Sequence, residues 1–150
     1  MKYFLMGLFF SINVFAIDSN TKEQLNNVFK SYESLHASFF SFDKKKVIDG
    51  SKELAEKISS IEDEEVSKLL AYSKKTLNKM SKEEDRSELN NQLNRISMAL
   101  IHIMKKYSLD LDYSSYYCPM VKKKWIQNSK KVSEVQNPYA PEMPNCGAKE

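Results

Sequence analysis

Apolar residues recur every three or four positions through most of this chain, which is the spacing of one face of an α-helix. The first such stretch begins near Ser19 or Asn20, and we expect one of these to cap the helix, with Glu23 as the capping-box partner. Its apolar face consists of Leu25, Val28, Phe29, Tyr32, Leu35 and Phe39. The pattern predicts an amphipathic helix that ends near Phe39 and is followed by a turn.

Three more stretches with the same spacing follow. Asp43 is well placed to cap the second helix, acidic residues at 62–65 begin the third, and Ser81 with Glu84 is expected to cap the fourth. The apolar positions are Val47, Leu54, Ala55, Ile58 and Ile61 in the second, Val66, Leu69, Leu70, Leu77 and Met80 in the third, and Leu89, Leu93, Ile96, Leu100, Ile103, Met104 and Tyr107 in the fourth. Four such helices with short links predict an antiparallel up-down four-helix bundle over residues 17–107.

The character of the chain changes after Tyr107. Residues 108–150 contain both cysteines, all four prolines and the single tryptophan, Trp125. The aromatic residues of this segment need burial, so we expect it to fold back onto the helices. The predicted fold class is all-α, an antiparallel up-down four-helix bundle with an irregular C-terminal segment, rich in cysteine, proline and aromatic residues, packed against it. Residues 17–150 then form a single helical domain.

Residues 1–16 have a different pattern. Lys2 precedes a mainly apolar run that extends to Phe15, and Ala16 ends a small-residue cleavage motif. The run is shorter than the roughly 20 apolar residues that span a bilayer. We therefore expect a cleaved signal peptide, a periplasmic or secreted protein, and no transmembrane segment in the mature chain.

Charge and motifs narrow the possible functions. The formal net charge is +3, from 23 basic and 20 acidic residues, and this balance gives no reason to expect a nucleic-acid partner. The helices lack the HEXXH motif of zinc proteases, the GxSxG motif of hydrolases and the P-loop of nucleotide-binding proteins. We therefore expect a protein that is not an enzyme.

Cys118 and Cys146 support two interpretations. In an oxidising compartment they tend to form a disulfide, which closes a loop of about 29 residues and contributes roughly 3–4 kcal/mol. The resulting function is that of an interaction module without metal, in which Trp125 contributes to a docking surface for a partner protein. Alternatively, Cys118-x-Met120 and Met143-x-x-Cys146 supply two thiolates and two thioethers, a ligand set that favours Cu(I) or Ag(I) over hard cations. Both interpretations stay open, because a reduced protein can bind metal and an oxidised one can form the disulfide.

Two histidines differ in their predicted positions. His36 falls on the apolar face of the first helix, between Tyr32 and Phe39, whereas His102 lies on the solvent side of the fourth helix, as does Met98. A histidine at the position of His36 is more often a core-edge residue with one hydrogen bond, and the alternative is an imidazole ligand that faces the site. The candidate metal ligands are therefore Cys118, Met120, Met143 and Cys146, with His36 as a fifth.

Four short motifs follow one another in the C-terminal segment. They are Tyr117-Cys118-Pro119-Met120, Trp125, Asn137-Pro138-Tyr139 and Met143-Pro144-Asn145-Cys146-Gly147. In this the chain resembles a bacterial exported domain of unknown function, which occurs as a small secreted protein and as an extra domain on periplasmic adaptor subunits of copper/silver-type heavy-metal efflux pumps. The resemblance implies a link to soft metals and, as partners, periplasmic components of an efflux system. The chain departs from the family pattern at residues 122–124, where a Gly-Ala pair is common, and at Pro141.

Overall fold

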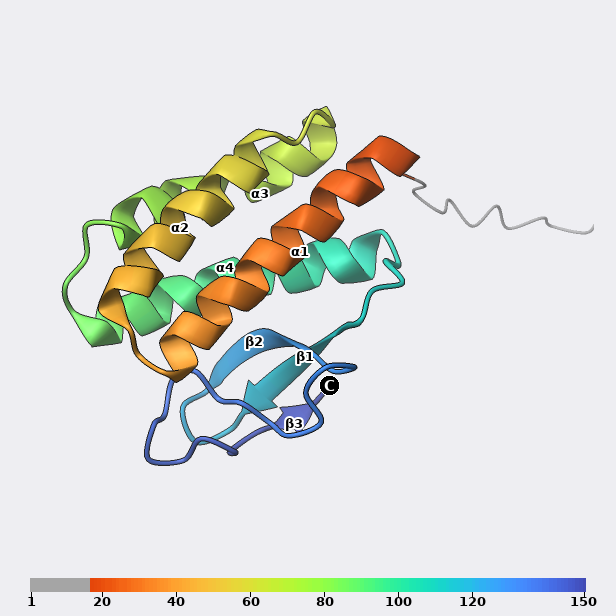
Figure 1. The fold of residues 1–150 in the computed structure, drawn as a ribbon. Coiled ribbons are helices and arrows are strands. Elements are labelled where there is room, and N and C mark those ends of the chain that lie inside the picture. The colour runs from red at the N-terminus through yellow and green to blue at the C-terminus, as the bar shows by residue number, and fades with distance from the viewer. Residues whose placement is uncertain (1–16) are drawn as a thin grey trace, which may run out of the picture.

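The computed structural model describes residues 17–150, so the predicted signal peptide lies outside the described residues (Figure 1). The elements are α1 (Ser19–Phe40), α2 (Lys44–Ser59), α3 (Glu64–Met80), α4 (Arg86–Lys106), β1 (Tyr113–Cys118), β2 (Lys123–Asn128) and β3 (Ala148–Lys149). Consecutive helices run back and forth, and each packs against the next (Figure 1). None of the helices within residues 17–150 is long and apolar enough to cross a membrane.

All four helices begin directly after an aspartate. The capping residues are Asp18, Asp43, Asp63 and Asp85. Each carboxylate accepts a hydrogen bond from the backbone amide three residues later, which satisfies one of the free N–H groups of the first turn. The prediction is confirmed at Asp43. It is wrong for the first helix, where Ser19 or Asn20 was expected, and for the fourth, because Ser81 ends α3 instead.

The predicted apolar faces form the core. All six predicted positions of α1, from Leu25 to Phe39, have no exposed surface. The face of α4 is buried in the same way, except that Met104 is only partly buried. His102 and Met98 are exposed, as predicted. The helical periodicity therefore identified the residues that hold the helices together.

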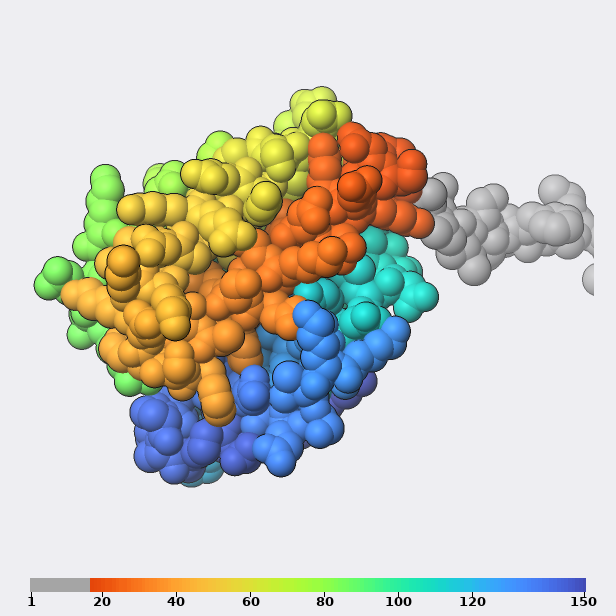
Figure 2. Space-filling view, viewed as in Figure 1, coloured from red at the N-terminus to blue at the C-terminus, as the bar shows by residue number. Residues whose placement is uncertain are grey.

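The C-terminal segment is not irregular throughout, contrary to the prediction. β1 and β2 form an antiparallel hairpin in which Tyr116 lies opposite Trp125, and β3 pairs with the other edge of β1, with Tyr117 opposite Ala148. The strand order is β2-β1-β3. Four helices and a small antiparallel sheet thus make up the fold. In the space-filling view the C-terminal segment lies directly against α1, without a visible gap (Figure 2).

The sheet is covered on both faces. On one face, Tyr113 packs against Phe29 of α1, with 5.5 Å between ring centroids. On the other face, Tyr116 and Trp125 stack at 5.7 Å, and Tyr139 meets Trp125 edge-on at 6.1 Å. Since side chains alternate between faces, Cys118 lies on the same face as Tyr116, under the loop that contains Tyr139.

Side chains of the helices close the outer edge of β2. The backbone amide of Lys124 donates to Oδ1 of Asn94 in α4 at 2.8 Å, and the amide of Ile126 donates to the Tyr32 hydroxyl of α1 at 3.3 Å. The Tyr32 hydroxyl also lies 2.6 Å from Ser97 Oγ of α4. The strand edge is therefore satisfied by α1 and α4, which fixes the sheet against both helices.

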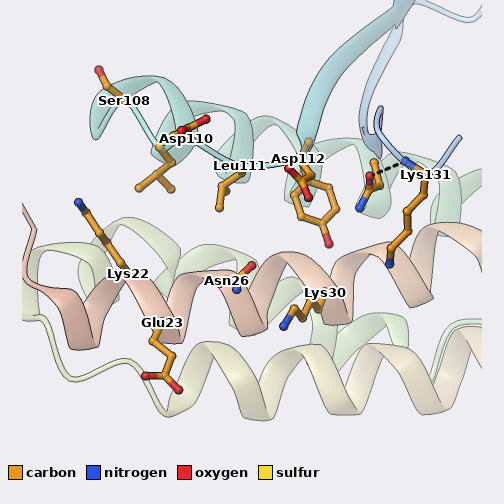
Figure 3. A pocket seen from close by; sticks show the side chains of 12 residues that line it. Lys22, Glu23, Asn26, Lys30, Ser108, Asp110, Leu111, Asp112 and Lys131 are labelled. Atoms are coloured by element: carbon orange, nitrogen blue, oxygen red, sulfur yellow. Dashed lines mark hydrogen bonds between the residues drawn. The ribbon is translucent and has the colours of Figure 1, made fainter. Parts of the chain in front are cut away.

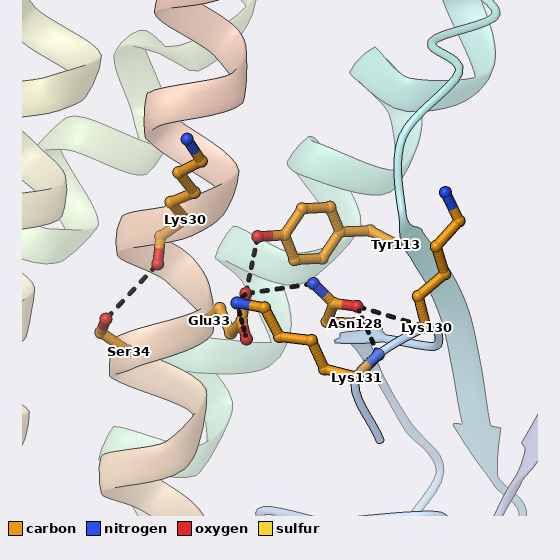
Figure 4. A network of polar contacts seen from close by, with 7 residues as sticks. All are labelled: Lys30, Glu33, Ser34, Tyr113, Asn128, Lys130 and Lys131. Carbon is orange, nitrogen blue, oxygen red and sulfur yellow. Dashed lines mark hydrogen bonds and ion pairs between the residues drawn. The ribbon is translucent and has the colours of Figure 1, made fainter. Parts of the chain in front are cut away.

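Glu33 makes a second link between α1 and the sheet (Figure 4). Its carboxylate accepts hydrogen bonds from Tyr113 Oη at 2.7 Å, Asn128 Nδ2 at 3.4 Å and Lys131 Nζ at 3.1 Å. Partial burial acts to raise the pKa of Glu33, but the three hydrogen bonds outweigh it and lower the pKa overall. Glu33 thus remains charged and joins α1 to both long strands.

Candidate functional site

The pairing of β3 with β1 brings the two cysteines together. Cys118 is the last residue of β1, and Cys146 lies two residues before β3. The two cysteine side chains approach each other to 2.6 Å, and both are free thiols. This proximity is the condition that a disulfide and a shared metal ion have in common. The structure therefore joins the two motif halves that the sequence places 28 positions apart, Cys118 and Cys146.

The turn after β1 surrounds the sulfur of Cys118 with hydrogen-bond donors. The backbone amides of Met120 and Val121, the side chain of Asn137 and the thiol of Cys146 all donate to it. Pro119 has no N–H group, so Met120 provides the first amide after the cysteine. Consecutive amides of this kind form a concave site that stabilises negative charge. The Cys-Pro-Met sequence thus makes a turn suited to a thiolate.

The two thiols differ in their readiness to ionise. Burial acts to raise the pKa of Cys118, yet the four hydrogen bonds outweigh it and lower the pKa overall. The pKa of Cys146 is raised, chiefly because its thiol donates to the Cys118 sulfur and so retains its proton. Cys118 has no exposed surface, whereas Cys146 is partly exposed. The site therefore combines a buried sulfur that favours the thiolate with an accessible one that favours the thiol.

Asn137 connects the two halves of the site. Its side-chain amide donates to the carbonyl of Cys146 at 2.9 Å, and its backbone amide donates to the carbonyl of Pro144 at 2.7 Å. Its Oδ1 accepts from the backbone amide of Tyr139 at 2.9 Å, which is an Asx-turn. The sequence analysis gave Asn137 no role. Its position directly before Pro138 was the available signal, because asparagine in such turns bonds to the backbone two residues later.

Trp125 forms the floor beneath Cys146 and Gly147. Gly147 has a φ of 143°, and a Cβ atom there would lie 2.5 Å from Trp125 Cη2, so glycine is required. The hydroxyl of Tyr139 donates to the carbonyl of Lys124 at 2.6 Å and holds the loop on the same ring. Trp125 has no exposed surface, and the prediction that it contributes to a docking surface is therefore wrong. Instead it lies close enough to Gly147 to report on the site by fluorescence.

The two methionines of the predicted ligand set occupy different environments. Met120 is 68% exposed, and its backbone amide donates to both cysteine sulfurs, so its side chain projects into solvent beside the pair. Met143 is partly buried, and its carbonyl accepts from the amide of Cys146 at 3.0 Å. Within residues 17–150, there is no group of three or more histidine, cysteine, aspartate or glutamate side chains that could hold a metal. A metal site here depends on two cysteines and the thioethers.

His36 supports the loop from α1. Its Nε2 lies 2.9 Å from the carbonyl of Gln136, the residue before Asn137, and its ring is 3% exposed. Burial lowers its pKa to about 4, so the ring is neutral and Nε2 is the donor. The bond occupies the nitrogen that faces the loop, which matches the core-edge interpretation of this histidine. Glu33, one helical turn earlier, points to Tyr113 and Lys131 instead.

An open groove of about 640 Å³ lies apart from the cysteines, between α1 and residues 108–113 (Figure 3). Lys22, Asn26 and Lys30 form its α1 wall, and Leu109 and Leu111 line the opposite side. Acidic side chains at 110 and 112 accompany the lysines, so the groove has no dominant charge. Its lining gives no indication of a particular ligand.

The resemblance to an exported domain associated with efflux pumps rests on the four motifs of the C-terminal segment, and it stays a prediction. Comparison of the chain with protein-family models, with curated proteins and with solved structures finds no match.

Proposed function

We propose that this chain binds a soft monovalent metal ion, Cu(I) or Ag(I), through Cys118 and Cys146. Thiolates favour such ions, and two sulfur ligands suffice for Cu(I) in preference to hard cations, which take oxygen. The observation that carries the proposal is the meeting of the two cysteine side chains at 2.6 Å, with hydrogen-bond donors placed around the sulfur of Cys118.

The residues present fit the proposed ion in two respects. Metal binding needs deprotonated cysteines, and the amides of Met120 and Val121 favour the thiolate of Cys118. Hydrogen bonds to a metal-binding atom also fix the orientation of that atom. The side chain of Asn137 makes such a bond to the sulfur of Cys118. The loop therefore does not need to be reordered for the first ligand, which reduces the entropic cost of binding.

The methionines extend the ligand set. The backbone amide of Met120 lies at both sulfurs, and its exposed thioether is the proposed third ligand for an ion that arrives from solvent. Met143 belongs to the turn that positions Cys146. We assign His36 to loop support, since its Nε2 is bonded to Gln136. The motif resemblance favours an exported protein that buffers the ion or transfers it to a periplasmic efflux component.

The test is a Cu(I) titration of the fully reduced protein against a chromophoric Cu(I) chelator, without oxygen. We expect one ion per chain, with a change in Trp125 fluorescence on binding. Cys118→Ser and Cys146→Ser should each weaken binding by about 100-fold, and Met120→Leu by up to about 10-fold.

Met98→Leu is the matched control, because Met98 is 53% exposed on α4 and is not near the motif segment in sequence. It should bind Cu(I) as the wild-type protein does. The proposal fails if wild-type protein and Cys118→Ser bind Cu(I) equally weakly.

A second function is favoured by the same proximity. A Cys118–Cys146 disulfide would fasten β3 to β1 and make the chain a stapled interaction module without a metal. It predicts that protein purified from an exported fraction has no thiols that react with a maleimide in denaturant. Two reactive thiols per chain would exclude this form.

A further inference from the structure

We infer that Cys118 and Cys146 form a reversible disulfide that exchanges with an external protein dithiol in a fixed order, with Cys146 attacked first and Cys118 leaving. This goes beyond a permanent staple, because it assigns the pair a reaction, a direction and a class of partner. It uses the cysteines of the proposed metal site but requires no metal.

The first argument for this order of attack is the access of a partner to each cysteine. An attacking thiolate must reach one sulfur of the disulfide from outside the protein. Cys118 has no exposed surface and lies under the 132–147 loop, whereas Cys146 is partly exposed. Of the two cysteines, only Cys146 has exposed surface, so it is the one that a partner can approach.

The order follows second from the environment of the leaving sulfur. When the S–S bond breaks, the sulfur that was not attacked departs with the electron pair, and exchange is faster when that thiolate is stabilised. The sulfur of Cys118 accepts hydrogen bonds from the amides of Met120 and Val121 and from Asn137. These donors are held by the β1–β2 turn and the Asn137 Asx-turn, so they are in place before the bond breaks.

The surroundings of Cys146 also suit a protein partner. Pro141 is exposed and Pro144 partly exposed in the same loop, and Met120, beside the cysteine sulfur, is 68% exposed. The flexible, polarisable thioether of Met120 therefore offers an apolar contact next to the cysteine pair. A partner that presents a reactive dithiol can use this contact when it approaches Cys146.

The reaction proceeds in two exchanges. A partner thiolate attacks Cys146 Sγ, the Cys118–Cys146 bond breaks, and Cys118 leaves as the thiolate. The second partner thiolate then attacks the partner sulfur of the mixed disulfide and releases Cys146, which takes up a proton. Two electrons pass from the partner dithiol to this chain, and the partner ends as a disulfide. In the reverse direction, a partner disulfide oxidises the pair.

The experiment follows each cysteine separately in the metal-free full chain. Cys118→Ser and Cys146→Ser variants are incubated with oxidised glutathione, and mixed-disulfide formation is followed by mass spectrometry. We expect Cys146, in Cys118→Ser, to react at least about tenfold faster than Cys118 in Cys146→Ser, because Cys118 is fully buried and Cys146 in this variant no longer donates its proton to the Cys118 sulfur. Equal rates, or faster reaction at Cys118, would overturn the inference, as would a wild-type chain that forms no internal disulfide at any glutathione ratio.

Asn137→Asp tests the leaving sulfur. Aspartate has nearly the same shape but lacks the donor N–H groups, so reduction of the wild-type disulfide by dithiothreitol should slow by about tenfold. Asn145→Asp is the matched control. This substitution adds the same charge in the same loop, but the side chain of Asn145 donates to the carbonyl of Val135 and not to a sulfur. An equal rate in both variants would remove Asn137 from the mechanism. Circular dichroism confirms that each variant is folded. Failure of Cu(I) binding leaves these results unaffected, so the two proposals are tested independently.

Discussion

The helices and the C-terminal segment are stabilised in different ways. In α1 to α4 the backbone bonds to itself, and apolar faces such as that of Leu25 to Phe39 provide the packing. In residues 129–147 the backbone has few regular partners, and particular side chains supply them. We therefore expect a helix to tolerate many substitutions on its polar face, whereas the loop depends on individual donors and acceptors.

Gln127 illustrates the dependence of the loop on single side chains. Its Nε2 donates to the carbonyl of Glu134 at 2.6 Å, and its Oε1 accepts from the amide of Gln136 at 2.9 Å. Its side chain therefore acts in place of a neighbouring strand. Together with Asn137, it holds the loop over Cys118 by bonds that the apolar pattern of the sequence does not encode.

Substitution of the two glycines of residues 17–150, one in the C-terminal segment and one in a helix, should have the most different effects on stability. At Gly147, alanine brings a Cβ to 2.5 Å from Trp125 and requires a φ of 143°, which together cost about 4 kcal/mol. We expect Gly147→Ala to release β3 from β1, which exposes Trp125 and both cysteines. The measurement is the fluorescence maximum of Trp125 together with the rate of maleimide labelling at Cys118.

Gly50→Ala is the control within the helices. A Cβ there meets Leu35 Cδ1 at 3.4 Å, and alanine is favoured over glycine in a helix by about 1 kcal/mol. We expect unchanged or slightly increased stability to urea. If Gly50→Ala proves the more damaging of the two, the proposed difference between the regions is wrong.

The sequence predicts the helical part well because its physics is local. Periodicity identifies the buried faces. Asp43 directly follows the turn predicted after the first helix, whereas Asp18 is followed at once by Ser19 and Asn20, which are equally common caps. β1 escaped prediction because both faces of the sheet are covered, so residues 113–118 show no alternation of polar and apolar residues.

The sequence predicts only part of the candidate site, because it reveals residue types and local spacing but not contacts between distant segments. The sequence identifies Cys118 and Cys146, because few residue types share their chemistry. It does not identify Asn137, whose partners at 118, 144 and 146 become neighbours only after the sheet has formed. The Asn137-Pro138 pair signals only the local Asx-turn, and the bonds of Asn137 to distant backbone groups have no counterpart in the local sequence.

His36 connects the two regions, and pH tests that connection. Its pKa is lowered to about 4 by burial, from an ordinary value of 6.5. Above pH 6.5 the ring is neutral in both the folded and the unfolded chain. Between pH 6.5 and 4 only the unfolded chain takes up the proton, so the free energy of unfolding falls by about 3 kcal/mol over this range. Below pH 4 this contribution is constant.

The measurement is urea unfolding from pH 7 to 4, in wild type and in His36→Gln, which can still donate to the carbonyl of Gln136. Acidic residues titrate equally in both proteins, so the difference between the two curves isolates His36. His102→Gln, at an exposed position of α4, should follow the wild-type curve. Parallel curves for wild type and His36→Gln would mean that the ring is protonated in the folded protein.

Tyr32 gives the smallest expected effect, and its substitution tests the contribution of one hydroxyl to the contact between α1 and β2. Tyr32→Phe keeps the packing but leaves the buried amide of Ile126 without its acceptor, and it removes the bond to Ser97. An unsatisfied buried amide costs about 2 kcal/mol, so the urea midpoint should fall accordingly and the Ile126 amide should exchange faster. Tyr72→Phe, 61% exposed on α3, should change neither quantity. If Tyr32→Phe also leaves both unchanged, the Tyr32 hydroxyl does not help to hold β2 against α1, and the contrast between the two regions weakens at that contact.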